Sequence, residues 1–233
     1  MKHRVVITGL GFCTPLGRGA EPVWQELLAG RSGVGAITLF DASALPVRIG
    51  GEVKSLDLDP LVEQFPAASG EKDRKVWLGL DAAWQAFRDA GLAEPDLTQA
   101  LLSVGVSLEV FFIEEVAPVA AADNLALALA HRAVNSGKAG RIQVPLDRLA
   151  QVLGDRYGLR SGRYTNCSAC AAGAQAIGEA FRRLQRGAAA VAMAGATDST
   201  LNPLGLGGFS LLRILSTENE QPTRACRPFD ATR

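Results

Sequence analysis

Residues 188–196 read AAAVAMAGA, nine consecutive residues without a polar side chain. A strand of this composition has no face to show to water, so both faces of its sheet need to be covered by other elements. Strand-like and helix-like segments alternate along the rest of the chain, which favours an α/β fold with helices on both sides of a sheet. With 233 residues, the chain is long enough to bury such a core without disulfides or metals.

Apolar periodicity predicts several helices, and glycines mark the ends of some of them. Apolar residues at steps of three and four predict a helix over residues 71–90, ended by Gly91, and an alanine-rich helix of small residues over 170–187. Further predicted helices cover residues 22–30, 123–134, 146–157 and 204–212, and further predicted strands cover residues 4–8, 47–53, 101–108 and 163–168. No repeat or linker divides the chain, so residues 1–233 are expected to form one domain.

Composition excludes some classes of protein. The 24 Lys and Arg residues balance the 24 Asp and Glu residues, which disfavours a nucleic-acid binder with a basic field. No run approaches the ~18 to 20 apolar residues of a membrane span, and the start of the chain lacks a secretory signal. The four cysteines then predict thiols in a reducing compartment, and we expect a cytoplasmic protein. These cysteines are Cys13, Cys167, Cys170 and Cys226.

Cys170 is the strongest candidate for chemistry. It lies where a predicted strand ends and a predicted helix begins, so free backbone N–H groups and the helix dipole would stabilise its thiolate. The small residues that follow would leave the sulfur at the bottom of a cleft. A buried cysteine that acts only as a small apolar residue is the plain alternative, and local context does not decide between them.

A second hypothesis uses two cysteines. Cys167 and Cys170 form a C-x-x-C pair before a helix, which is typical of thiol-disulfide oxidoreductases. Such a motif normally opens a small domain, whereas this pair lies deep in a long chain. The other cysteines and the two histidines, His3 and His131, show no paired spacing, so no metal site is predicted.

The glycines near the N-terminus invite a dinucleotide-binding interpretation. Gly9, Gly11 and Gly17 do not fit G-x-G-x-x-G, because Thr14 occupies the position of the last glycine. We therefore expect a tight structural turn here and no nucleotide cofactor.

Several segments in order resemble one family, the β-ketoacyl-acyl carrier protein synthases of the thiolase-like superfamily. No segment is decisive alone, but the ordered set is specific and extends from Arg4 to Arg233. The segments are residues 5–11 (VVITGLG), 14–17 (TPLG), 24–33 (WQELLAGRSG), 40–41 (FD), 157–159 (YGL), 168–171 (SACA), 203–209 (PLGLGGF), 215–217 (LST) and 227–230 (RPFD).

The resemblance implies a thiolase-like layered α/β/α fold and a cofactor-free Claisen condensation. Cys170 would accept an acyl group as a thioester, and a malonyl unit on an acyl carrier protein would be decarboxylated and condensed with it in fatty acid or polyketide synthesis. The family chain consists of two similar halves, and this sequence covers the first. The two histidines and the lysine that assist decarboxylation belong to the second half, which is absent here.

The resemblance also implies binding residues. Leu108, Phe111 and Phe112 match a wall of the acyl pocket, and Phe209 matches its mouth. The wall departs from the family, because Glu109 to Phe112 stand where many relatives have small residues. Basic residues that match a docking surface for the acidic carrier protein are Lys72, Arg74, Lys75, Lys138, Arg141 and Arg213.

The expected partners follow from the same family. They are the acyl carrier protein and a second synthase subunit, in a homodimer or heterodimer joined near residues 163–166. The family includes partner subunits without the cysteine, so a non-catalytic fragment is a third hypothesis. Because Cys170 is present, the chain is placed on the catalytic side.

Overall fold

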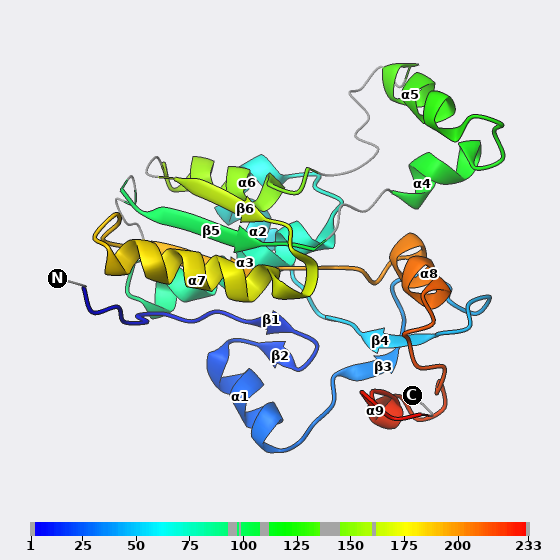
Figure 1. Ribbon diagram of the computed structural model, residues 1–233, viewed down its shortest axis with the longest axis horizontal. Helices are drawn as coiled ribbons and strands as arrows, with labels where there is room; N and C mark the ends of the chain where they lie inside the picture. The colour runs from blue at the N-terminus through cyan, green and yellow to red at the C-terminus, as the bar shows by residue number, and fades with distance from the viewer. Residues whose placement is uncertain are drawn as a thin grey trace.

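The computed structural model describes residues 3–92, 97, 99–107, 112–135, 145–159 and 162–231. Its centre is a three-stranded parallel sheet in the order β6-β5-β7 (Figure 1). The strands are β5 (Leu101–Gly105), β6 (Arg163–Asn166) and β7 (Ala192–Ala196). β5 is buried along its whole length, as expected for the middle strand of a covered sheet.

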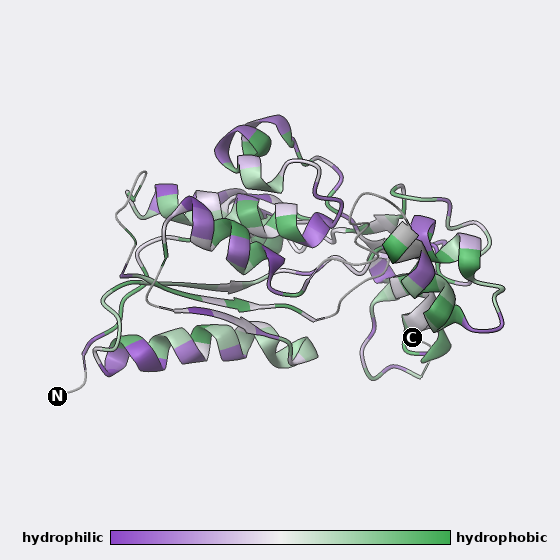
Figure 2. Cartoon of the chain, turned by 90° about the horizontal axis from the view of Figure 1, so that it is seen from above, coloured by the Kyte–Doolittle hydropathy of each residue, from purple (hydrophilic) through white to green (hydrophobic). Residues whose placement is uncertain are grey.

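Helices cover both faces of this sheet. α7 (Ala172–Gln185) lies on one face, and α3 (Arg74–Asp89) and α6 (Arg148–Arg156) lie on the other, so the structure has three layers (Figure 2). The buried residues of α7 are Ala172, Ala176 and Ala180, at steps of four, and their small side chains let the helix approach the strands closely. The predicted α/β fold with two covered faces is confirmed, although β7 is a half-buried edge strand.

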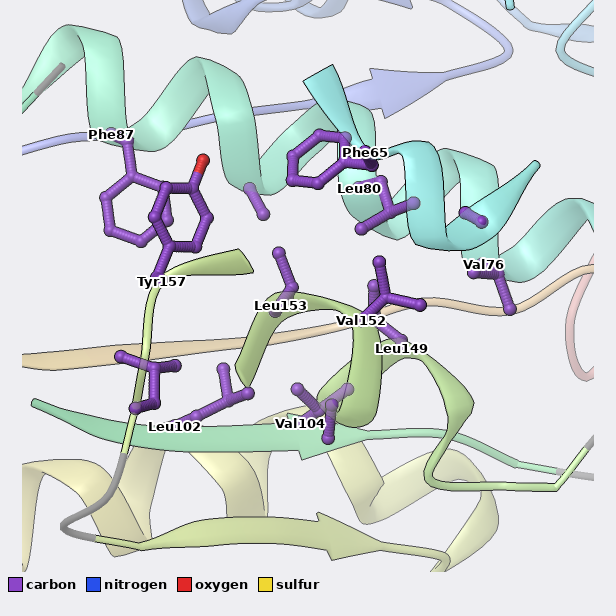
Figure 3. Packing of buried hydrophobic residues seen from close by; sticks show 14 of the residues in the cluster. Phe65, Val76, Leu80, Phe87, Leu102, Val104, Leu149, Val152, Leu153 and Tyr157 are labelled. Atoms are coloured by element: carbon purple, nitrogen blue, oxygen red, sulfur yellow. The ribbon is translucent and has the colours of Figure 1, made fainter. Parts of the chain in front are cut away.

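The main core fills the space between α3, α6 and the sheet (Figure 3). Leu80 of α3 and Leu153 of α6 are buried within it. The ring of Tyr157 lies 4.3 Å from that of Phe87 and 6.3 Å from that of Phe65, measured between centroids. These edge-on and tilted contacts fix the end of α6 against α3.

A smaller core lies beyond the sheet and contains Val47, Ile49, Leu206 and Ala225. It joins the pair β3 (Val34–Ala36) and β4 (Ile49–Gly51) to α8 (Pro203–Leu211) and α9 (Pro222–Ala225). The other described elements are β1 (Cys13–Thr14), β2 (Gly17–Arg18), α1 (Ala20–Leu28), α2 (Asp59–Gln64), η1 (Pro66–Ala68), α4 (Ile113–Val116), η2 (Ala117–Val119), α5 (Leu125–Asn135) and η3 (Ala169–Ala171). Within the described ranges, no helix has the length and apolar character needed to cross a bilayer.

The predicted strand at residues 4–8 is wrong, because the first strand that the structure describes is β1. The N-terminal segment runs along α3 without a sheet partner. Its backbone N–H groups are bound by side chains of that helix: Leu10 donates to Asp89 Oδ2 at 2.8 Å and Phe12 to Gln85 Oε1 at 3.2 Å. A strand requires a partner edge, and local sequence does not supply one.

The glycines of this segment serve two purposes. Gly17 has a φ of 144° and follows the turn between β1 and β2, as the predicted turn requires. Gly9 and Gly11 do not form a turn. A Cβ on either residue would collide with the backbone of α3, at Ala86 and Ala82 respectively, so these glycines allow close approach of two backbones.

The end of β5 makes a second close approach, and we predict that Gly105→Ala destabilises the fold. A Cβ there would lie 2.5 Å from the carbonyl carbon of Ala172 and 2.7 Å from the backbone nitrogen of Gly173. To relieve these clashes, the backbone of the strand or of the helix would have to move. The expected loss is about 1–3 kcal/mol in urea unfolding.

The matched control is Gly195→Ala in the adjacent strand, where a Cβ meets no atom within 4 Å. That variant should be neutral or slightly stabilising. Equal unfolding midpoints for the two variants would contradict this account of the contact.

Candidate active site

All three strands of the sheet are parallel, so their carboxyl ends meet at one edge. In open α/β sheets this edge is where ligands bind. The backbone ladder continues for one residue past the strands: Val106 N–H donates to Asn166 O at 2.9 Å, and Thr197 N–H donates to Gly105 O at 3.1 Å. The edge is therefore ordered beyond the strands themselves.

Ser107 then connects all three strand ends. Its hydroxyl donates to the Oδ2 atom of Asp198, which follows β7. Its carbonyl accepts a hydrogen bond from the thiol of Cys167, which follows β6, at 2.8 Å. Sequence analysis did not identify Ser107 or Asp198, because no local pattern links residues 91 positions apart.

Cys170 lies in η3, between the end of β6 and the start of α7. The side chain is exposed at the carboxyl edge. Cys170 therefore lies at the amino end of α7, which is the positive end of the helix dipole. The preceding residue, Ala169, has a φ of 49°, a left-handed conformation that non-glycine residues rarely adopt. The predicted strand-to-helix position of Cys170 is confirmed.

The turn that carries Cys170 has polar anchors. Ala171 N–H donates to Ser168 O at 3.1 Å, which closes the turn. Gln175, on the first turn of α7, accepts hydrogen bonds from Asn166 Nδ2 and Ser168 Oγ at 3.0 and 2.8 Å. Gln175 was also missed from sequence, although it is the first polar side chain after Cys170 in a run of small residues.

Cys13 lies in a different environment from the exposed Cys170. It is half-buried beside Asp81, whose carboxylate is fully buried and bound by Arg18 at 2.5–2.8 Å. Burial and then the negative charge of Asp81 raise the pKa of Cys13 from 9.0 to about 12. This thiol is therefore protonated and unreactive at neutral pH.

The predicted docking cations differ in what the structure permits. Lys72 is exposed, with its ammonium 5.3 Å from the ring centre of Phe112. Arg74 is half-buried and donates to Val53 O at 2.6 Å. Lys75 is only 2% exposed, and its ammonium pairs with Asp73 at 2.8 Å. Lys75 therefore cannot face a partner, and the expectation for this residue is wrong.

The remaining predicted residues come from several parts of the chain. Arg213 is exposed, Phe209 is half-buried on α8, and Phe112 packs against the main core. Leu108, Phe111, Lys138 and Arg141 lie outside the described residues. In the parts of the chain that are described, no three His, Cys, Asp or Glu side chains come together as metal ligands.

Known proteins show the same arrangement of segments. Residues 2–232 match the family model of the β-ketoacyl synthase N-terminal domain. The chain belongs to the β-ketoacyl synthase family. This membership agrees with the thiolase-like α/β/α layering and with a cysteine at the carboxyl edge of the sheet.

Individual relatives within the β-ketoacyl synthase family support the match. The chain is 34% identical to 3-oxoacyl-(acyl-carrier-protein) synthase 2 of Synechocystis over 233 residues, which is all of this chain and 54% of that protein. It is 32% identical to the mitochondrial 3-oxoacyl-(acyl-carrier-protein) synthase of Arabidopsis thaliana, with 99% and 53% covered. A crystal structure of a β-ketoacyl synthase from Burkholderia phymatum aligns with a TM-score of 0.71 at 26% identity, over 100% of this chain and 55% of that one. The chain thus spans about half the length of the relatives it matches.

We predict that iodoacetamide at pH 8 labels the exposed Cys170 and Cys226 at least about a hundredfold faster than Cys13, because so little of Cys13 is thiolate. Peptide mass spectrometry gives each rate. In denaturant the difference should disappear. Since the folded pKa of Cys13 lies above 9.0, its ionisation opposes folding, and stability should fall as pH rises from 9.0 toward about 12. Labelling of folded Cys13 within tenfold of Cys226 would be inconsistent with this environment.

Proposed function

We propose that Cys170 is the acyl acceptor of a 3-oxoacyl-acyl carrier protein synthase in fatty acid or polyketide synthesis. The observation that carries this proposal is its position: an exposed thiol in η3, at the carboxyl edge of the sheet and before the first N–H groups of α7. The names of the matched relatives give the reaction class.

The first half-reaction is thioester exchange. The Cys170 thiolate attacks the carbonyl carbon of an acyl thioester, a new C–S bond forms, the donor C–S bond breaks, and the carrier leaves as a thiolate, which takes up the proton that Cys170 lost. Sulfur suits this step because it is both a soft nucleophile and a good leaving group. Backbone N–H groups at the start of α7 would stabilise the oxyanion of the tetrahedral intermediate.

The second half-reaction forms a carbon–carbon bond. A malonyl thioester loses CO₂, and the resulting enolate carbon attacks the acyl carbonyl and expels Cys170 as a thiolate. The enolate oxygen needs positioned hydrogen-bond donors, which the family's second half would supply. Residues 1–233 are accordingly proposed to be the half that carries the nucleophile.

The structure supports this function over dithiol redox chemistry. The Cys167 thiol donates to Ser107 O at 2.8 Å and so has a structural partner. In a redox pair, the thiol of Cys167 would instead have to form and break a disulfide bond with Cys170. The matched relatives are synthases rather than oxidoreductases.

Substrate and carrier contacts are proposed for the residues that remain suitable. Leu108, Phe111, Phe112 and Phe209 would line the acyl pocket, and Lys72 and Arg213 would meet the acidic carrier protein, with Arg74, Lys138 and Arg141 at the same rim. Lys72 and Arg213 are exposed, which such steering requires. The ring of Phe112 beneath the Lys72 ammonium would join the docking rim to the pocket wall.

Two open surfaces fit the proposed assembly. On the outer side of α7, Ile177 and Phe181 are 57% and 46% exposed, which suits packing against the second half. The only described partner of β6 is β5, so its outer edge could join a second synthase subunit in a homodimer or heterodimer. A cytoplasmic location stays a prediction based on the free thiols.

The test of the proposed function is acylation of single variants. With an acyl thioester donor, the native protein should gain one acyl group on Cys170 by mass spectrometry, and Cys170→Ala should lose it. Cys167→Ala should keep a rate within about tenfold of the native one, because it removes only one hydrogen bond. Labelling that survives Cys170→Ala and disappears in Cys167→Ala would assign the wrong cysteine.

We also predict that residues 1–233 alone do not condense malonyl thioesters at a useful rate. The only histidines are His3 and His131, which match neither of the family's decarboxylation histidines, and each missing donor costs on the order of a hundredfold in rate. The measurement is malonyl-dependent product formation, with and without a second-half polypeptide, together with sedimentation. Condensation by the soluble chain alone would defeat the assignment.

A further inference from the structure

The turn that carries Cys170 stores backbone strain. Ala169 has a φ of 49°, and a non-glycine residue keeps this conformation only where its surroundings hold it there. The turn is exposed rather than packed in a core, because Cys167, Ala169 and Cys170 all lie at the surface. Polar contacts must therefore replace packing as the restraint.

Gln175 provides the most concentrated of these contacts. Its Oε1 atom accepts from Asn166 Nδ2 at 3.0 Å, on the strand side of the turn, and from Ser168 Oγ at 2.8 Å, within the turn. One oxygen thus receives two donors from residues that bracket Cys167. Asn166 Nδ2 also lies 3.4 Å from Ala172 O, so the same amide contacts the first residue of α7.

The amide oxygen of Gln175 is itself fixed by the fold. It belongs to the first turn of α7, whose Ala172 and Ala176 are buried against the sheet. A side chain that starts on this turn and reaches back to Ser168 connects the strained segment to a helix that packs on the sheet. Among the described residues, Gln175 is the side chain that hydrogen-bonds to both Asn166 and Ser168.

We propose that Gln175 is a positioning residue that holds the Cys170 turn in its strained conformation, so that the sulfur stays beside the N–H groups that stabilise the acyl oxyanion. This inference rests on the proposed acyl-transfer function. It distinguishes two reactions of the same thiol: acyl transfer passes through an oxyanion and needs the N–H groups, whereas alkylation by iodoacetamide needs only an accessible thiolate.

The test compares these reactions in three variants. Gln175→Met keeps the length of the side chain but offers only a weak acceptor, and Gln175→Glu keeps oxygen acceptors at the same reach. Gln185→Met makes the same substitution at the far end of α7 and serves as the control. The probes are a small acyl thioester and iodoacetamide, and the rate at exposed Cys226 is the internal reference for alkylation.

We expect Gln175→Met to slow acylation of Cys170 about three- to tenfold, the loss expected for one or two neutral hydrogen bonds. The ratio of Cys170 to Cys226 alkylation should change by less than about twofold, Gln175→Glu should recover most of the acylation rate, and the control should match the native protein. Equal loss of acylation and alkylation with a lowered urea midpoint would show a merely structural role, and unchanged acylation would also overturn the proposal.

A second measurement tests the positioning role of Gln175 separately from the proposed acyl-transfer function. Amide hydrogen exchange across residues 167–171 should accelerate in Gln175→Met and return toward native rates in Gln175→Glu. If the native protein accepts no acyl group, the proposed function fails, and exchange still decides whether Gln175 holds the turn. Unchanged exchange in Gln175→Met would overturn that role.

Discussion

The contact between the carboxyl end of β5 and the amino end of α7 determines the position of Cys170, the proposed nucleophile. Gly105 has no side chain, so the backbone of the strand lies directly against that of Ala172 and Gly173. A Cβ added to Gly173 would lie 3.1 Å from the Cβ of Ala196, so this residue is also close to the end of β7. The start of α7 is thus fixed against the ends of two strands. The turn before it, η3, therefore lies over the carboxyl edge of the sheet.

Ion pairs with buried carboxylates fix the other side of the sheet. Arg18 binds both oxygens of Asp81, which ties the β1–β2 hairpin to α3, and Lys75 pairs with Asp73 at the start of that helix. Removing water from such charges is costly, so each pair serves geometry more than stability. The carbonyl of Lys75 also accepts from Thr197 Oγ1 at 2.7 Å, so the helix start is joined to the residue that follows β7.

Much of this architecture could be predicted, because its signals are local. Gly30, Gly91, Gly158 and Gly187 all have positive φ values, as expected for glycines that end helices. The position of Cys170 between strand and helix follows from the same local patterns. The ordered family segments then gave the thiolase-like layering.

What could not be predicted depends on pairs of distant residues. The segment at 4–8 has strand composition but forms no strand in the structure. Lys75 is a residue type that is usually exposed, but its ammonium is buried and pairs with Asp73. The bond from Ser107 to Asp198 spans 91 positions and has no sequence signature. Gln175 is recognisable in the sequence as a polar residue, but its hydrogen bonds to Asn166 and Ser168 depend on the folded turn.

Ser107 marks the last point at which strand register controls the chain. Up to this residue the three strands are aligned by backbone bonds, and at it they are joined by one hydroxyl and one carbonyl. Residues 109–112, which belong to the proposed wall of the acyl pocket, begin two positions later. On the proposed function, substitutions in that segment would change which acyl groups are accepted, while the two hydrogen bonds of Ser107 keep the three strand ends aligned beside Cys170.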